Sequence, residues 1–177
     1  MRRIIVSVVF AIIASCYLWS CEKDDICADG TPVTPSLIIS MYNKDNQTEK
    51  KQGNIQYYMD VDGVVNEIGP TVTDSLVVPL RTDAEVVKWG FTLITSAAGG
   101  GTNENTDFLE FKYTHDEIYV SRACGYKSLF YLNEDTTGGL NPELTDNDPA
   151  DNLWIEDVVV IRSNIEDENS AHVKIYF

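Results

Sequence analysis

The feature that most constrains the fold is a period of two in the apolar residues along most of the chain. In the segment 55–61, for example, the odd positions are Ile, Tyr, Met and Val, and the even positions are Gln, Tyr and Asp. Successive side chains of a strand point to opposite faces, so this alternation indicates half-buried strands. No segment shows a convincing helical face, and the sequence therefore predicts an all-β protein.

Turn signals divide the alternating segments into about nine short strands, a number typical of a β-sandwich. We expect a single antiparallel sandwich of 8–9 strands, immunoglobulin-like or transthyretin-like. Asp62-Gly63 predicts a tight hairpin. Pro79 predicts an edge strand or a bulge, because proline has no N–H to donate. The expected strands are 37–42, 55–61, 76–80, 86–94, 108–114, 118–124, 128–132, 153–162 and 171–177, and the hairpin turn after 55–61 leads into 64–65.

The N-terminus has the layout of a secretory signal. Arg2 and Arg3 are followed by a run without charge until Glu22, and the apolar part, 4–19, is shorter than the ~20 residues that a transmembrane helix needs. A small residue stands directly before Cys16 and again before Cys21, and both sites resemble the lipobox of bacterial lipoproteins.

The local match favours Cys16, whereas two other arguments favour Cys21 as the lipidated residue. Cleavage before Cys21 removes the whole apolar run, and it leaves the even pair Cys27 and Cys124 in an oxidising compartment. We therefore expect a signal peptide at 1–20, a tether at 21–35 that carries the palmitate-type lipid on Cys21, and a β-sandwich domain at 36–177.

The segment 22–25, Glu-Lys-Asp-Asp, resembles the signal that follows the lipidated cysteine in surface lipoproteins of Bacteroidetes-type bacteria. This resemblance implies an outer-membrane lipoprotein displayed at the cell surface, and a periplasm-facing position is the alternative. The formal net charge is −15. Nucleic acid is therefore excluded as a partner, because phosphate backbones require clustered Lys and Arg.

The acidic loop 133–152 is the strongest candidate for a cation site, with Asp146, Asp148 and Asp151 as possible ligands. The EF-hand pattern fails, since Asp151 stands where glycine is required, and a solvated acidic loop is the other interpretation. The Gly-rich loop 97–107 lacks the Lys-Ser/Thr of a phosphate-binding loop and predicts a hairpin connection.

Catalytic equipment is sparse, and we expect neither an enzyme nor a cofactor. His172 is expected to point into solvent, opposite the apolar face of its strand, and His115 to lie in a turn at 114–117. Neither histidine has metal-ligand spacing to a second His or Cys. Cys27 and Cys124 are interpreted as a structural disulfide, because exported thiols meet an oxidising environment.

Three segments carry a more specific resemblance: 78–93, 107–132 with Ser-Arg-Ala-Cys-Gly at 121–125, and the terminal 171–177. Together with 21–39 they resemble a family of uncharacterised flavobacterial lipoproteins, domain of unknown function 6452. The family implies an anchored all-β domain without an assigned activity. In the structural interpretation of 121–125, Cys124 forms the bridge, Gly125 bends the strand end and Arg122 faces an acid; in the functional one, Tyr119, Arg122 and Tyr126 form a ligand patch.

Two functions therefore remain open. The first is a non-enzymatic binding or interaction module in the cell envelope, held in the membrane by Cys21 and serving an envelope protein partner. The second is a glycan- or cation-binding lipoprotein that uses the 133–152 loop together with exposed aromatics such as Trp89 or Trp154. The alternation around Trp89 places it in the core, which argues against the second function.

Overall fold

The computed structural model describes residues 26–133 and 141–177, and this part of the chain is all-β, with eleven strands and no helix. It accordingly contains no helix that is long and apolar enough to cross a membrane. The strands are β1 Leu37–Tyr42, β2 Gly53–Val61, β3 Val64–Thr73, β4 Ser75–Val78, β5 Val86–Ser96, β6 Thr102–Ser121, β7 Gly125–Leu132, β8 Glu143–Asp146, β9 Asp157–Val160, β10 Asn164–Ile165 and β11 Val173–Tyr176.

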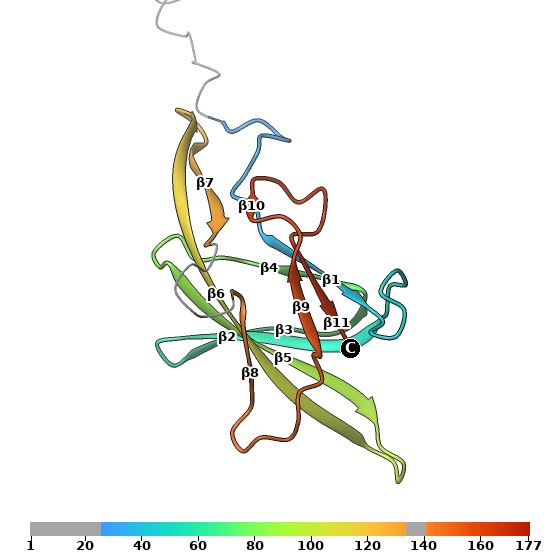
Figure 1. The fold of residues 1–177 in the computed structure, drawn as a ribbon. Helices are drawn as coiled ribbons and strands as arrows, with labels where there is room; N and C mark the ends of the chain where they lie inside the picture. Colours follow the sequence, from blue (N-terminus) through green and yellow to red (C-terminus); the bar gives the residue numbers. More distant parts are fainter. Residues whose placement is uncertain (1–25, 134–140) are drawn as a thin grey trace, which may run out of the picture. The chain divides into compact units, whose positions relative to one another are not determined.

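Two open sheets form a sandwich-like fold (Figure 1). One has four strands in the order β4-β1-β11-β9. The other has seven, in the order β10-β7-β6-β5-β2-β3, with β8 also paired to β6. Most registers are antiparallel, as expected, but β1 and β11 pair in parallel, with Ile39 opposite Val173. The C-terminal strand therefore lies inside the smaller sheet, between β1 and β9.

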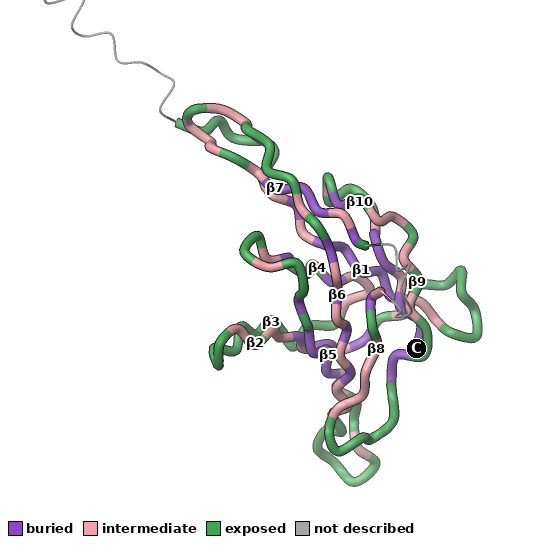
Figure 2. The backbone as a smooth tube through the Cα atoms, turned by 60° about the vertical axis from the view of Figure 1, so that its left-hand side comes forward, coloured by how far each residue is buried: buried purple, intermediate pink, exposed green. Residues whose placement is uncertain are grey.

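The core is built from the inward faces of both sheets, as the period of two predicts (Figure 2). The smaller sheet contributes buried residues of β1, β4 and β11, such as Ile39 and Ile175, and the larger sheet contributes aromatic residues of β5, β6 and β7. Trp89, expected in the core, is 1% exposed, and its ring centroid lies 5.8 Å from that of Tyr57.

Both local signals for turns and edges are confirmed. Asp62 and Gly63 adopt φ angles of 53° and 82° between β2 and β3, as a tight hairpin requires, and the Asp60 carboxylate accepts the Gly63 N–H at 2.8 Å. Strand β4 is the edge of the smaller sheet and ends at Val78, directly before Pro79. Because Pro79 lies outside the strand, its lack of an N–H leaves no hydrogen bond of the sheet unmade.

Several expected boundaries are wrong. The turn at 114–117 does not exist, because β6 runs without a break through it, and His115 lies half-buried in that strand, with its ring centroid 6.1 Å from that of Phe130. Strand β8 lies within the expected 133–152 loop and pairs with β6, while the expected strand 153–162 shortens to β9. In each case pairing with another strand decided the boundary, and the composition of the segment alone does not specify that pairing.

The described residues divide into two compact units. The first, here called the disulfide unit, comprises 26–32 and 119–126. The second, the sandwich unit, comprises 33–118, 127–133 and 141–177. The hydrophobic core belongs wholly to the sandwich unit.

Candidate functional site

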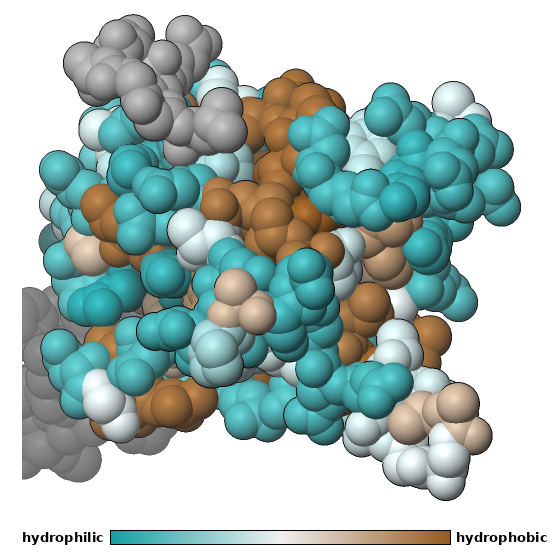
Figure 3. All heavy atoms as spheres, turned by 60° about the horizontal axis from the view of Figure 1, so that its bottom comes forward, coloured by the Kyte–Doolittle hydropathy of each residue, from teal (hydrophilic) through white to brown (hydrophobic). Residues whose placement is uncertain are grey.

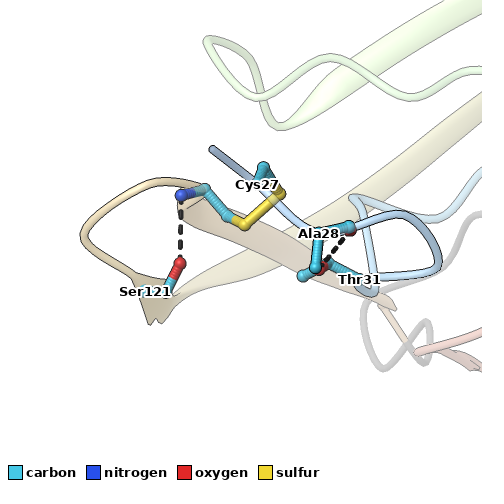
Figure 4. The surroundings of a disulfide bond; sticks show 5 residues. Cys27, Ala28, Thr31 and Ser121 are labelled. Atoms are coloured by element: carbon cyan, nitrogen blue, oxygen red, sulfur yellow. Dashed lines mark hydrogen bonds between the residues drawn. A yellow bond between two sulfur atoms is a disulfide. The ribbon is translucent and has the colours of Figure 1, made fainter. Parts of the chain in front are cut away.

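The disulfide unit is organised by the expected bridge between Cys27 and Cys124. The two Cα atoms lie 4.9 Å apart, and the cysteines are separated by 97 positions in sequence (Figure 4). Closing a loop of this length restricts the unfolded chain strongly, which stabilises the folded state by roughly 4–5 kcal/mol in the chain-entropy model. The bridge therefore joins residue 27 to the turn between β6 and β7.

The segment 121–125 forms that turn, and its residues have identifiable structural roles. The hydroxyl of Ser121 accepts the Cys124 N–H at 3.0 Å (Figure 4). Gly125 takes a φ of 70°, a conformation that an L side chain rarely adopts, so the expected bend is confirmed. The expected acid opposite Arg122 is not found: no described carboxylate lies within ion-pair distance of this side chain.

Tyr119 and Tyr126 are brought together on this turn, as the ligand-patch hypothesis requires. Their ring centroids lie 5.4 Å apart at an interplanar angle of 67°, and the residues are 58% and 66% exposed. Tyr119 and the exposed Arg122 also line a shallow hollow of about 620 Å³, together with residues of the 26–31 segment; Tyr126 lies outside it. The three candidate residues thus form one exposed surface of two aromatic rings and one cation.

A second hollow, of about 580 Å³, lies in the sandwich unit over the smaller sheet. Three of its lining residues are cations, but each has a partner. Lys50 pairs with Asp74 at 3.1 Å, Arg162 pairs with Asp167 at 3.2 Å, and the Lys174 ammonium lies 4.6 Å from the centroid of the Tyr42 ring. Its cations are therefore engaged within the protein.

His172 adjoins this hollow, and the expectation that it points into solvent is wrong. The residue is fully buried just before β11, where its Nδ1 accepts the Ile38 N–H at 3.0 Å and its Nε2 lies 2.6 Å from Nη2 of Arg162. Burial, reinforced by the Arg162 charge, lowers its pKa to about 4. The alternation of β11 does not extend back to residue 172, because the His172 side chain turns inward to accept a hydrogen bond from the backbone of β1.

Asp107 is a buried acid that the sequence did not single out. Its Oδ2 accepts the backbone N–H groups of Trp154 and Ile155 at 2.8 and 2.7 Å, whereas Oδ1 is buried and has no partner among the described residues. Burial raises its pKa to about 6 despite these two bonds. In the sequence, Asp107 is only an acid at the end of a Gly-rich segment, and acids in such positions are typical of exposed loops. Nothing in that pattern indicates a buried carboxylate.

The acidic loop does not bring its carboxylates together. Asp146 uses both oxygens locally, accepting the N–H of Asn147 at 2.7 Å and of Asn152 at 3.0 Å, while Asp148 and Asp151 are exposed. Across 26–133 and 141–177, no group of three or more His, Cys, Asp or Glu residues could hold a metal ion. Glu134 and Asp135 of the same loop lie outside the described residues.

Exposed apolar residues also follow β3, the edge of the larger sheet, where Val64 and Val72 are the most exposed. Pro70 interrupts this edge, and the register with β2 shifts between Ile55 and Tyr57 at the same level. Proline and bulges are devices that discourage edge-to-edge pairing. On the face drawn in Figure 3, hydrophobic residues form patches among hydrophilic ones.

A protein-family model matches most of this chain. Residues 55–177 match DUF6452, which is described as a family of unknown function. The chain belongs to the DUF6452 family. No curated protein and no solved structure matches it.

The DUF6452 match contains one half of the disulfide unit and not the other. It includes Tyr119, Arg122, Cys124 and Tyr126, whereas Cys27 precedes the first matched residue. The DUF6452 region also includes Asp107 and His172, whose perturbed pKa values arise inside the sandwich unit. The match confirms the expected DUF6452 identification and adds no activity.

Proposed function

We propose that this protein is a lipid-anchored, non-enzymatic interaction module of the cell envelope, attached through Cys21 to the outer membrane and displayed at the cell surface. Cleavage before Cys21 gives a tether of 21–35 and leaves the sandwich domain facing water. The high negative charge then keeps the exposed domain soluble and separate from its copies.

The observation that carries this proposal is the Cys27–Cys124 disulfide. Structural disulfides form and persist in oxidising compartments, which supports export. The bridge uses two of the four cysteines, and only Cys16 and Cys21 remain. Cleavage before Cys21 discards Cys16 and lipidates Cys21, so that no free thiol is left.

The distribution of polar groups supports a binding role over a catalytic one. The two titratable groups with strongly perturbed pKa values, Asp107 and His172, are both fully buried and hold backbone N–H groups of their own fold. Burial explains their pKa values as structural features. The exposed candidate residues Tyr119, Arg122 and Tyr126 supply two aromatic rings and one cation, which suit a binding surface rather than proton transfer.

The anchor is tested by comparing Cys21→Ser with the matched control Cys16→Ser in a bacterium that has an outer membrane. We expect Cys21→Ser to lose the lipid and to remain unprocessed, and Cys16→Ser to behave as the wild type. The measurements are mass spectrometry of the N-terminal peptide and fractionation of the membranes. A lipid on residue 16, or normal processing of Cys21→Ser, would overturn the proposal.

The interaction role is tested by native purification of the lipidated protein followed by mass spectrometry of co-purifying envelope proteins. A control lipoprotein in which residues 1–26 precede an unrelated folded domain provides the comparison, because it has the same proposed anchor without the sandwich domain. We expect an envelope protein that is recovered with the wild type and is absent from the control. Identical recovery from both proteins would show that the sandwich domain binds no partner.

A further inference from the structure

We infer that the Tyr119, Arg122 and Tyr126 surface of the disulfide unit contacts the phospholipid headgroup layer of the membrane that anchors the protein. In this arrangement the tyrosine rings insert among the headgroups and Arg122 pairs with lipid phosphate. The inference rests on the proposed lipidation of Cys21 and extends it from a point of attachment to an oriented contact.

The length of the tether is the first step of the argument. Six residue steps separate Cys21 from Cys27, so the two Cα atoms are at most about 22 Å apart even when the chain is fully extended. The disulfide places the Cα of Cys124 4.9 Å from that of Cys27. The turn between β6 and β7 is therefore held close to the lipid, whatever path the tether takes.

The two tyrosines lie close to that turn. Tyr126 is two residues from Cys124, about 7 Å along a strand, and its ring contacts that of Tyr119. A headgroup layer is itself about 5–8 Å thick on each side of the hydrocarbon core. Both rings are consequently within reach of the layer once the tether shortens by bending, and no rearrangement of the disulfide unit is needed.

The chemistry of the surface fits a headgroup layer. Tyrosine has an apolar ring and a polar hydroxyl, and it is enriched where membranes meet water. Arg122 has no carboxylate partner among the described residues, and a guanidinium binds phosphate through paired hydrogen bonds. Ile26, at the start of the described chain, adds an exposed apolar side chain beside the same hollow.

Charge distribution points to the same surface. Residues 26–32 and 119–126 include one acid, Asp29, and one base, Arg122, so their formal charge is zero, and the adjoining tether residues 22–25 carry −2. The chain without residues 1–20 has 11 basic and 28 acidic residues, a formal charge of −17. A strongly acidic surface is repelled by anionic headgroups, and the repulsion falls off with distance. The neutral disulfide unit therefore approaches a membrane at a lower electrostatic cost than the acidic remainder of the protein does.

The test introduces a fluorescent reporter at the proposed contact and at a matched site. Tyr119→Trp is compared with Val72→Trp in the lipidated full-length protein, because Val72, on β3 of the sandwich unit, is 66% exposed and so offers a similarly accessible position. Both variants are reconstituted into phosphatidylethanolamine and phosphatidylglycerol vesicles whose acyl chains carry bromine, a quencher of tryptophan. The wild-type signal from the buried Trp89 and Trp154 is subtracted.

We expect bromine to quench Tyr119→Trp at least about twofold more strongly than Val72→Trp, because only the first reporter reaches the layer where tyrosine and tryptophan settle. Equal quenching of the two reporters would overturn the inference. So would shielding of Tyr119→Trp from aqueous iodide without bromine quenching, which would indicate that a second copy of the protein covers the surface.

Flotation of the same vesicles separates the two proposals. If the protein floats with its lipid and bromine does not quench Tyr119→Trp, the anchor stands and the oriented contact is wrong. If the protein carries no lipid and does not float, the proposed anchor is wrong and the contact falls with it. The Cys21→Ser protein defines the unanchored baseline for both measurements.

Discussion

Two fully buried titratable residues, Asp107 and His172, have pKa values displaced in opposite directions by the same cause. Burial disfavours the charged form of any group, so it raises the pKa of the acid and lowers that of the base. Each residue nevertheless accepts backbone N–H groups of a distant segment, which would otherwise be left unpaired. Their contribution to stability therefore depends on pH.

Asp107→Asn should remove the pH dependence that Asp107 gives to the free energy of unfolding. The pKa of Asp107 rises from 3.8 to about 6 on folding, so the folded state binds its proton more tightly, and this stabilisation is lost as pH rises through that window. The free energy of unfolding of the wild type, relative to Asp107→Asn, should fall by on the order of 2 kcal/mol between pH 4 and pH 7. Urea unfolding at both pH values measures it, and a constant difference would contradict the raised pKa.

His172→Gln should remove the loss of stability that His172 causes at low pH. Glutamine retains an acceptor for the Ile38 N–H but does not titrate. The pKa of His172 falls from 6.5 to about 4 on folding, so its contribution is intact above pH 6.5 and is lost as pH falls toward 4. The variant should therefore lose less stability than the wild type over that window. Chemical unfolding at several pH values gives the comparison, and parallel curves for the two proteins would exclude the effect.

At the scale of elements, hairpins and edges follow local chemistry more closely than strand lengths do. The β2–β3 hairpin forms where Asp-Gly predicts it, since positive φ angles at both central residues suit the twist of the flanking strands. Strand β6, by contrast, runs for 20 residues through a segment with turn-like composition. Its neighbours in the sheet hold His115 and Asp116 in an extended conformation that their own preferences do not specify.

Gly63→Ala should destabilise the hairpin by about 1–2 kcal/mol, because a Cβ is disfavoured in the left-handed region. Gly63 has a φ of 82°, and no atom lies within 4 Å of the position that the alanine Cβ would occupy, so backbone strain is the only expected cost. Gly99→Ala is the matched control: it has equal space and no positive φ. Thermal unfolding of the two variants measures the difference, and equal losses would rule out φ as the cause.

At the scale of the whole molecule, the ends of the sandwich unit meet in the smaller sheet. Strand β11, the last in the chain, lies between β1 and β9, with Ile175 opposite Met41 and Val158. The sheet is therefore complete only when the entire domain has been made. A parallel pair of this sequence separation has a large loop-closure cost, which the buried core must offset.

Ile175→Asp should unfold the sandwich. Ile175 is fully buried in the core, and an unpaired carboxylate there costs on the order of 4 kcal/mol or more, a large part of a typical domain's stability. Lys174→Asp, on the adjacent and half-exposed position, is the control and should remain folded. Dispersion of amide signals in NMR spectra distinguishes the two, and a folded Ile175→Asp would show that β11 is dispensable.

Prediction from the sequence succeeded where the deciding physics is local. The alternation in 55–61 shows which faces are buried, Asp62-Gly63 forms its hairpin, and Pro79 marks an edge. The Cys27–Cys124 pair follows from a count of the cysteines that remain after the expected cleavage before Cys21, and the structure confirms it. The candidate surface of Tyr119, Arg122 and Tyr126 was also identified, but its geometry was not, because the ring contact depends on how β6 and β7 pair.

The sequence by itself determined the all-β class, the principal turns and the identity of the bridged cysteines, since periodicity, turn chemistry and cysteine parity are written in neighbouring or countable residues. Only the tertiary structure decided that β11 pairs in parallel with β1, that His172 is buried against Ile38, and that Asp107 holds the backbone of Trp154. Each of these contacts joins residues at least 47 positions apart. Their formation depends on which surfaces meet when the sheets pack, and no local pattern encodes that choice.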